Sequence, residues 1–370
     1  MKPMIAWLKK EKVLLIALAL ACLSMLLTPP DKAYLDYIDL RTLALLFCLM
    51  LLVKGFQGVG LFDWLIGRAF GRVKTLRRLC RMLVLLCFFT SMVITNDVAL
   101  ITFVPFAMLA LKLCGQQAHL ILVVVLQTIA ANLGSMATPI GNPQNLYLFS
   151  MSGMPIGTFF LTMLPLAALS LLLILLATLI FPREPIRMAL PEHRSAMPRR
   201  ELLAYMALFM LNLLVVFRVL PWGVALAATV AGVLLLRKAA LLRQVDWALL
   251  LTFVGFFVFV GNLGRVEAIS AWLQQALTGR EVLLSALMSQ ALSNVPAALL
   301  LSGFTENYPA LLAGVNIGGL GTLIASMASL ISYKFYAAQP DANRGRYLLI
   351  FTACNAAGLV MLLAFQLLIA

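Results

Sequence analysis

Charge is scarce in this chain of 370 residues, and most of it has one sign. Only 11% of the residues are charged and 63% are apolar, while the formal net charge is +14. A soluble globular domain has about a quarter charged and about half apolar residues, so this composition excludes a soluble globule and indicates a polytopic membrane protein. The basic residues lie in short connections between apolar runs, which is a sign of membrane topology and not of nucleic-acid binding.

Cysteine and histidine are also few, and neither is arranged for chemistry. The six cysteines occur singly, without the paired spacing of a disulfide framework or a metal site. The two histidines, His119 and His193, are predicted to lie at the cytoplasmic edge, and no plausible Ser/His/Asp set accompanies them. We therefore expect no enzyme, no catalytic residue, no cofactor and no metal other than a bound sodium ion.

Apolar runs of membrane-spanning length divide the chain. A bilayer core about 30 Å thick needs about 20 apolar residues in a helix, and fewer where flanking side chains snorkel. The first run follows three lysines, as in a secretory signal, but further spans follow it and we expect an uncleaved helix. On this measure we predict spans near 13–28, 41–53, 158–181, 203–219, 222–236, 247–261 and 347–369.

The distribution of Lys and Arg predicts the orientation. With a cytoplasmic N-terminus, the segments on that side carry 23 of the 28 basic residues. Cytoplasmic loops are enriched in Lys and Arg, so the N-terminus is predicted inside and the C-terminus outside, in what we expect to be a bacterial inner membrane. The cytoplasmic segments are 1–12, 54–81, 112–119, 182–202, 237–246 and 334–346.

Two stretches 184 residues apart follow one template. Asparagine, glycine, threonine and isoleucine occur at 132, 134, 138 and 140, and again at 316, 318, 322 and 324. Each stretch follows an apolar hairpin, and the orientation places the first hairpin on the cytoplasmic side and the second on the outer side. Surface helices are expected before the hairpins, near 60–71 and 266–278. Such an order of parts, occurring twice with opposite orientation, predicts an inverted-topology repeat with its site near mid-membrane.

The expected fold is therefore an all-α polytopic membrane protein with two inverted-topology repeats, re-entrant hairpins, broken helices and about 11 membrane elements. Its predicted parts are a first helix and outer loop (1–40), repeat 1 (41–181, with hairpin 82–113 and broken helix 119–152), a cytoplasmic linker (182–202), two connecting helices (203–246), and repeat 2 (247–370, with hairpin 281–304 and broken helix 309–336).

Asp97, at the tip of the first hairpin, is the only acidic residue in the apolar interior of the chain. A carboxylate at this depth usually pairs, binds a cation or carries a proton. The alternative is a structural Asp97 held by backbone amides and Thr95, in a tip that only caps helices. The residues that we assign to the coupling cation, a sodium ion or a proton, are Thr95, Asn96, Asp97, Asn132 and Thr138.

The first broken helix is opened by Pro139, Gly141 and Pro143, which a continuous helix does not tolerate together. The half-helix that follows points its positive end at the gap and suits an anion, whereas carbonyls freed before the gap suit a cation. The second copy is opened by glycines, and the alternative for these is a small-residue packing face between helices. The residues that we assign to the substrate are Asn142, Gln144, Asn145, Ser293, Asn294, Asn316, Gly318 and Thr322.

These motifs resemble the ion-transporter superfamily, which contains citrate-transporter-like proteins, arsenite permeases, bacterial sodium/proton antiporters and divalent-anion/sodium symporters. The resemblance covers about residues 41–336 and rests on segments 95–100, 132–145, 293–294 and 316–318. It implies inverted repeats, paired hairpins, an elevator-like movement and often a homodimer. The symporters have Ser-Asn-Thr at the tips, and Asp97 at the third position is more like the arsenite permeases.

We therefore expect a cation-coupled secondary transporter, driven by Na⁺ or H⁺, that moves a small carboxylate or oxyanion across the lipid bilayer by alternating access. The alternative is a sodium/proton antiporter in which Asp97 binds both ions in turn and there is no organic substrate. A channel or a non-transporting membrane protein is less favoured, because hairpins that enter from opposite faces suit a site exposed to each side alternately.

Overall fold

The computed structural model describes residues 11–70, 73–186 and 198–369, so part of the predicted linker lies outside the described residues. Within these ranges the chain forms helices and loops, and no β-strand. The elements are α2 (Lys12–Ser24), η1 (Lys32–Leu35), α3 (Leu40–Gly58), α4 (Leu61–Phe70), α5 (Leu76–Ile94), α6 (Asn96–Leu113), η2 (Gln117–His119), α7 (Leu120–Ser135), α8 (Pro143–Ser152), α9 (Ile156–Ala177), η3 (Thr178–Ile180), α10 (Arg199–Val216), α11 (Trp222–Leu235), η4 (Ala239–Gln244), α12 (Trp247–Gly264), α13 (Glu267–Leu277), α14 (Glu281–Leu292), α15 (Asn294–Ser302), α16 (Tyr308–Ile317), α17 (Met327–Ala337) and α18 (Arg344–Ile369).

A helix occupies each of the seven predicted spans, namely α2, α3, α9, α10, α11, α12 and α18. Among the described residues, five helices are long and apolar enough to cross a membrane, or six if α3 and α4, with a bend of 58° between them, count as one span. The helical membrane architecture is thus as expected. Helix α6, the second arm of the first hairpin, is one of the five, so the re-entrant path of this hairpin stays a prediction, as does the inverted relation of the repeats.

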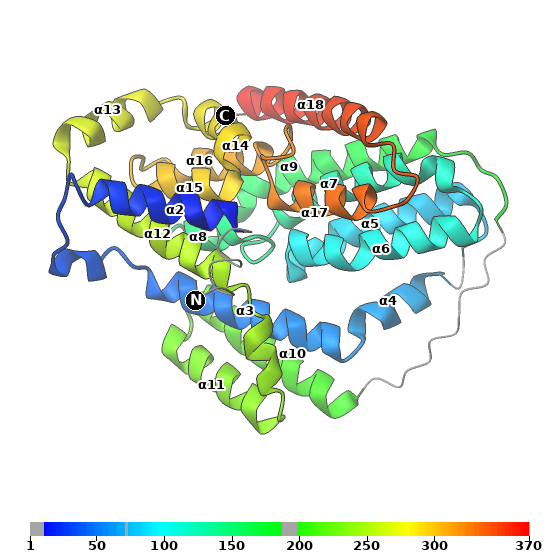
Figure 1. Cartoon of the computed structure of the whole chain (residues 1–370), viewed down its shortest axis with the longest axis horizontal. Coiled ribbons are helices and arrows are strands. Elements are labelled where there is room, and N and C mark those ends of the chain that lie inside the picture. Colours follow the sequence, from blue (N-terminus) through cyan, green and yellow to red (C-terminus); the bar gives the residue numbers. More distant parts are fainter. Residues whose placement is uncertain (1–10, 71–72, 187–197, 370) are drawn as a thin grey trace.

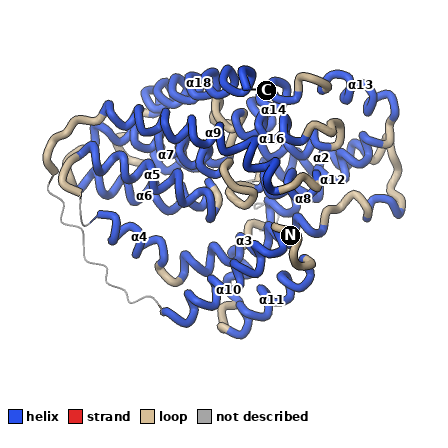
Figure 2. The backbone as a smooth tube through the Cα atoms, turned by 180° about the vertical axis from the view of Figure 1, so that it is seen from behind, coloured by secondary structure: helices blue, strands red, loops and turns tan. Residues whose placement is uncertain are grey.

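The helices form two packed groups. Helices α3, α10 and α11 contact one another and make up the lower part of Figure 1, whereas α5, α6, α7 and α18 lie above them. The view from behind in Figure 2 shows the same division. Helices α4 and α13, at the predicted surface-helix positions, lie at opposite edges of the molecule (Figures 1 and 2). The hairpins pack on the broken helices, with α5 against α7 and α14 against α16, and their second arms cross over, with α6 against α17 and α15 against α8.

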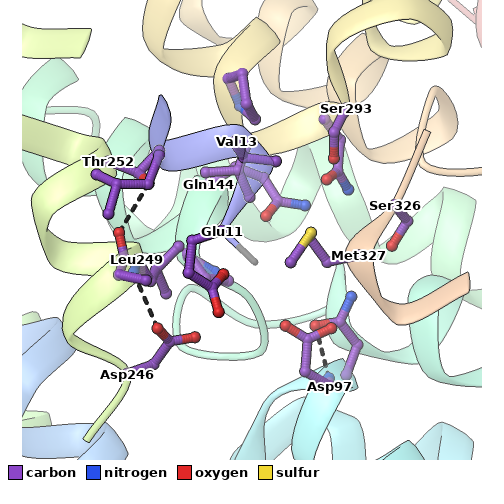
Figure 3. Close-up of a pocket in the computed structure, with 17 residues that line it drawn as sticks. Glu11, Val13, Asp97, Gln144, Asp246, Leu249, Thr252, Ser293, Ser326 and Met327 are labelled. Carbon is purple, nitrogen blue, oxygen red and sulfur yellow. Dashed lines mark hydrogen bonds between the residues drawn. The ribbon is translucent and has the colours of Figure 1, made fainter. Parts of the chain in front are cut away.

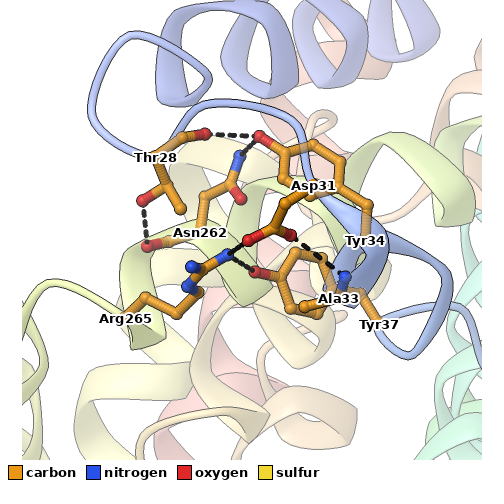
Figure 4. A network of polar contacts seen from close by, with 7 residues as sticks. All are labelled: Thr28, Asp31, Ala33, Tyr34, Tyr37, Asn262 and Arg265. Atoms are coloured by element: carbon orange, nitrogen blue, oxygen red, sulfur yellow. Dashed lines mark hydrogen bonds and ion pairs between the residues drawn. The ribbon is translucent and has the colours of Figure 1, made fainter.

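A polar network fastens the connection after α2 to the end of α12 (Figure 4). The buried amide of Asn262 donates to the hydroxyls of Ser24, at 2.9 Å, and Tyr34, at 2.8 Å. Nearby, the Arg265 guanidinium lies 2.8 Å from a carboxylate oxygen of Asp31. Since α2 also packs along α12, these contacts fix the first helix beside α12.

Glycines allow two pairs of helices to cross closely, and each pair contains the first arm of a hairpin. Helix α7 crosses α5 at Gly134, where a Cβ would overlap the backbone carbonyl of Phe88. Helix α16 crosses α14 at Gly314, where a Cβ would overlap the hydroxyl of Ser285. Small residues at helix interfaces let backbones approach closely in membrane proteins, so each crossing fixes the first arm of a hairpin against a broken helix.

We expect Gly134→Ala to lower the thermal unfolding temperature of the purified protein in detergent. The added methyl meets a backbone oxygen that cannot rotate away, and overpacking of this kind costs about 1–3 kcal/mol. Gly157→Ala is the matched control, because a Cβ at Gly157 meets open space. Equal unfolding temperatures for the two variants would show that the crossing at Gly134 is not tight.

Candidate functional site

The two hairpin tips have the same backbone conformation. Thr95 ends α5 with φ 71° and ψ 150°, and Ser293 ends α14 with φ 80° and ψ 152°. Positive φ at a non-glycine residue costs of order 1–3 kcal/mol and persists where the surrounding structure imposes it. The strain lies at the two positions where the sequence predicts the tips, and Asn96 and Asn294 follow as first residues of the returning helices.

Each tip is held against its broken helix by a matching backbone hydrogen bond. The Asn96 amide donates to the carbonyl of Gly141 at 3.3 Å, and the Asn294 amide donates to the carbonyl of Ala325 at 2.9 Å. Gly141 and Ala325 are 184 residues apart, the spacing of the sequence template. The two halves therefore build the same contact from equivalent positions.

The template threonines make a second matching contact. The hydroxyl of Thr138 donates to the carbonyl of Met92 at 2.5 Å, and that of Thr322 donates to the carbonyl of Gln290 at 3.1 Å. Both acceptors lie at the end of the first arm of a hairpin, where helix carbonyls lack intrahelical partners. The threonines thus fasten the breaks to the tips, and their assignment as ion and substrate ligands stays a prediction.

Asn132 in the first copy contacts the second copy directly. Its side-chain oxygen accepts from the side-chain amide of Asn96 at 3.0 Å and from the hydroxyl of Ser326 at 3.0 Å. Its amide donates to the carbonyl of Gly319 at 3.3 Å. A single buried side chain thereby joins the first hairpin tip, its own helix and the opposite break.

Asn316 makes the reciprocal contacts from the second copy. Its oxygen accepts from the amide of Asn142 at 3.0 Å, and its amide donates to the oxygen of Asn145 at 2.6 Å. Asn142 occupies the template position of Ser326, so the pair Asn316–Asn142 is equivalent to the pair Asn132–Ser326. The breaks are therefore joined by buried hydrogen bonds in both directions.

Helix α8 is capped at both ends. Asn142 accepts the backbone amide of Asn145 at 2.9 Å at the start, which is the usual role of an N-cap asparagine. At the other end, the guanidinium of Arg218 donates to the carbonyls of Phe149, at 2.9 Å, and Gly153, at 2.6 Å. A cation is favourable at a helix C-terminus, so Arg218, just after α10, ties α8 to the lower helix group. Arg218 is not among the residues that the sequence predicts for the site.

Six helices begin at one pocket of about 60 Å³ (Figure 3). They are α2, α6, α8, α12, α15 and α17. At about 10–15 Å³ for one water, the pocket has room for a few water molecules or a small ion. Helix N-termini present free N–H groups and a partial positive charge, so the pocket suits an anion. It is lined by Glu11, Val13, Leu14, Asn96, Asp97, Pro143, Gln144, Asp246, Ala248, Leu249, Thr252, Ser293, Asn294, Val295, Pro296, Ser326 and Met327.

Three carboxylates, those of Glu11, Asp97 and Asp246, also face this pocket (Figure 3), and no lysine, arginine or histidine is among the lining residues described. One oxygen of Asp97 is fully buried and has no hydrogen-bond partner in the described part of the protein. Asp246 already accepts the amide of Leu249 at 2.9 Å as the N-cap of α12. Asp97 is therefore the carboxylate best placed for a cation or a proton.

The structure brings five predicted site residues into the pocket lining: Asn96, Asp97, Gln144, Ser293 and Asn294. Four others form the asparagine links behind it: Asn132, Asn142, Asn145 and Asn316. Gly318 instead packs against α14, where a Cβ would lie 2.8 Å from Ala286 and Ser289, and Thr95 forms the strained tip.

Sequence reasoning did not assign Glu11 and Asp246 to the site. Each directly precedes an apolar helix, a position that in sequence reads as a solvated flank or an N-cap. Across the described residues no group of three His, Cys, Asp or Glu side chains is placed to hold a metal ion. A cation at Asp97 would therefore depend on one carboxylate together with amide and carbonyl oxygens.

Comparison with known proteins places the chain among transporters. A family model described as "Citrate transporter" matches residues 4–328. The "Inner membrane protein YbiR" of Escherichia coli (strain K12) is 34% identical, over 82% of each chain. The "Uncharacterized transporter MJ0456" of Methanocaldococcus jannaschii is 30% identical, over 89% of each chain. The crystal structure of the Alcanivorax borkumensis YdaH transporter has a similar fold, with a TM-score of 0.57 and 16% identity over 93% of this chain and 87% of that one.

Proposed function

Because the chain belongs to the citrate transporter family, we propose that it is a cation-coupled secondary transporter of a small anion that works by alternating access. The family and the names of the relatives indicate a membrane transporter and not an enzyme. The anion, the coupling cation and the mechanism are our proposal, as is a bacterial inner-membrane location, which is suggested by the relative from Escherichia coli.

One observation carries the proposal: six helix N-termini and a carboxylate with one unpartnered oxygen, that of Asp97, face the same small pocket. The N-termini attract a negative group, and Asp97 attracts a positive one. In this proposal Asp97 and Asn96 hold the cation, while Gln144, Ser293 and Asn294 contact the anion. The linked asparagines behind the pocket keep these groups in place.

The charge of Asp97 explains how cation and anion movement become coupled. Two like unit charges 4 Å apart repel by about 4 kcal/mol at an effective dielectric constant of about 20. This repulsion corresponds to about a thousandfold loss in affinity for an anion beside a bare carboxylate. A sodium ion or proton at Asp97 removes the repulsion, so the anion binds after the cation and the two move together.

An elevator-like movement in a homodimer belongs to the same proposal.

A sodium/proton antiporter is the second candidate, and the pocket lining favours it. Three carboxylates face the pocket and no basic side chain described there balances them. A site with this charge concentrates cations, and Asp97 alone could bind a sodium ion and a proton in turn. In that case the helix N-termini would serve to stabilise the ionised carboxylate.

Proteoliposome flux separates the two candidates. We expect one or more radiolabelled small carboxylates or oxyanions to accumulate only when a sodium or proton gradient is imposed. The antiporter instead predicts that added sodium dissipates a proton gradient with no organic solute present. Saturable flux without any dependence on sodium or pH would contradict both, and open-pore current would indicate a channel.

A further inference from the structure

A second cavity, with an apolar lining, has a volume of about 410 Å³. One wall is formed by α10 with the ends of α3 and α4, and the other by the end of α5, the connection between α7 and α8, and α9. Ile94 in the second wall directly precedes the tip residue Thr95, and Ile140 precedes Gly141, whose carbonyl accepts the Asn96 amide. The cavity therefore borders the segments that form the candidate site.

The cavity has no means of holding water. Its lining consists of apolar side chains with one exception, Thr138, whose hydroxyl is already donated to the carbonyl of Met92. Water in a buried site needs two to four polar partners, and apolar cavities stay dry or take up apolar molecules. An apolar occupant is thus the only kind that this lining stabilises.

The cavity runs along α10, which occupies the predicted span 203–219. Lining residues of α10 and its C-cap extend from Met206 to Phe217, which is about 16 Å of helix at 1.5 Å per residue. This length is close to half of the hydrocarbon core, which is about 30 Å thick. A slot with this length and direction matches one acyl chain in one leaflet of the bilayer.

The cavity is continuous with the apolar surface of the protein. Four of its lining residues are also exposed: Val93 at 44%, Met206 at 42%, Met210 at 47% and Phe217 at 45%. Others, such as Phe56 and Phe209, are nearly fully buried. In an integral membrane protein the exposed apolar surface faces lipid, so the rim opens to the bilayer and the interior is reached only through the slot.

We propose that this cavity is a binding site for one acyl chain of a bilayer phospholipid, inserted between α10 and the segments that carry the candidate site. The acyl chain fills the slot, keeps its apolar walls apart and packs against the residues just before the hairpin tip. Any movement of the hairpin relative to α10 must then displace the acyl chain or carry it along. Transport should therefore be sensitive to acyl-chain structure.

Photolabelling in proteoliposomes tests the site. The full-length protein is reconstituted with a phospholipid that carries a diazirine near the end of one acyl chain, irradiated, digested and mapped by mass spectrometry. We expect label on Phe56 and Phe209, which are buried in the cavity wall, and not on Phe103 or Phe351, which are equally buried elsewhere. Label on none of these four residues would overturn the proposal.

Two filling variants provide the second measurement. Val93→Trp and Met210→Trp add bulk from opposite walls at exposed rim positions, where folding tolerates the change. Each should reduce the label on Phe56 and Phe209 several-fold, whereas Leu161→Trp, at a site on α9 that is 80% exposed and outside the cavity, should not. Unchanged labelling of Phe56 and Phe209 in both filled variants would show that no acyl chain occupies the slot.

Discussion

Asp97→Asn is expected to abolish cation-driven accumulation of the substrate while the protein still inserts and folds. Asparagine keeps the size of the side chain but removes the charge that attracts the cation, and the Asp97 oxygen without a partner contributes no hydrogen bond to the fold. Two unit charges 4 Å apart interact by about 4 kcal/mol, and this free energy changes a binding affinity by about a thousandfold. Uptake into proteoliposomes under an imposed sodium or proton gradient measures the loss.

The same variant separates the two proposed functions. In a coupled anion transporter, Asp97→Asn also removes the repulsion of the anion, so substrate binding should persist and become independent of the cation. In a sodium/proton antiporter, all flux should disappear and no anion should bind. Asp63→Asn on α4 is the control, since this acidic residue is exposed and lies outside the pocket. Gradient-driven accumulation at the wild-type rate in Asp97→Asn would refute a coupling role for this carboxylate.

Asn316→Ala is expected to destabilise the fold by breaking the link between the two breaks. It removes the acceptor of Asn142 and the donor to Asn145, and both of these side chains are almost fully buried. A buried polar group left without a partner costs about 1–3 kcal/mol. The Asn145 oxygen is left in this state, whereas the Asn142 amide still donates to the Ser135 hydroxyl, so the loss of stability should be about 1–3 kcal/mol from Asn145 with a smaller contribution from Asn142. Thermal unfolding in detergent measures the loss, and transport should disappear in parallel because the two breaks are no longer joined.

Asn355→Ala on α18 is the matched control for this substitution. Asn355 is as buried as Asn316, but its amide donates only to the carbonyl of Phe351 one turn earlier, and its oxygen has no partner in the described part of the chain. Truncation of Asn355 leaves no side chain of another helix without a hydrogen-bond partner. Similar losses of stability in the two alanine variants would mean that the links between the breaks contribute little to the fold.

Much of the helical layout and part of the site could be predicted from local pattern. Apolar runs bounded by charged residues located the seven spans, since the length of a membrane helix is set by the bilayer and is read within one segment. The clustered prolines and glycine after Asn132 marked a break, because they remove donors and loosen the backbone. The same logic identified both hairpin tips, where Thr95 and Ser293 have positive φ.

The partners of these residues could not be predicted in the same way. The sequence template puts Asn132 and Asn316 in equivalent positions, but it does not say that each bonds across to the other copy. Glu11 and Arg218 lie near the ends of apolar helices, where a charge usually faces water, and only packing brings one to the pocket and the other to α8.

The sequence by itself determined the class of protein, the positions of the helices, the two breaks and the uncommon carboxylate at residue 97, because each depends on properties of a short continuous segment. The tertiary structure decided which helix ends converge on the pocket, which asparagines join the two copies and where the apolar slot lies. These features depend on contacts between segments that are far apart in the chain, such as Glu11 and Met327 in the pocket lining. Such contacts are set by close packing between segments, which the composition of a single segment does not reveal.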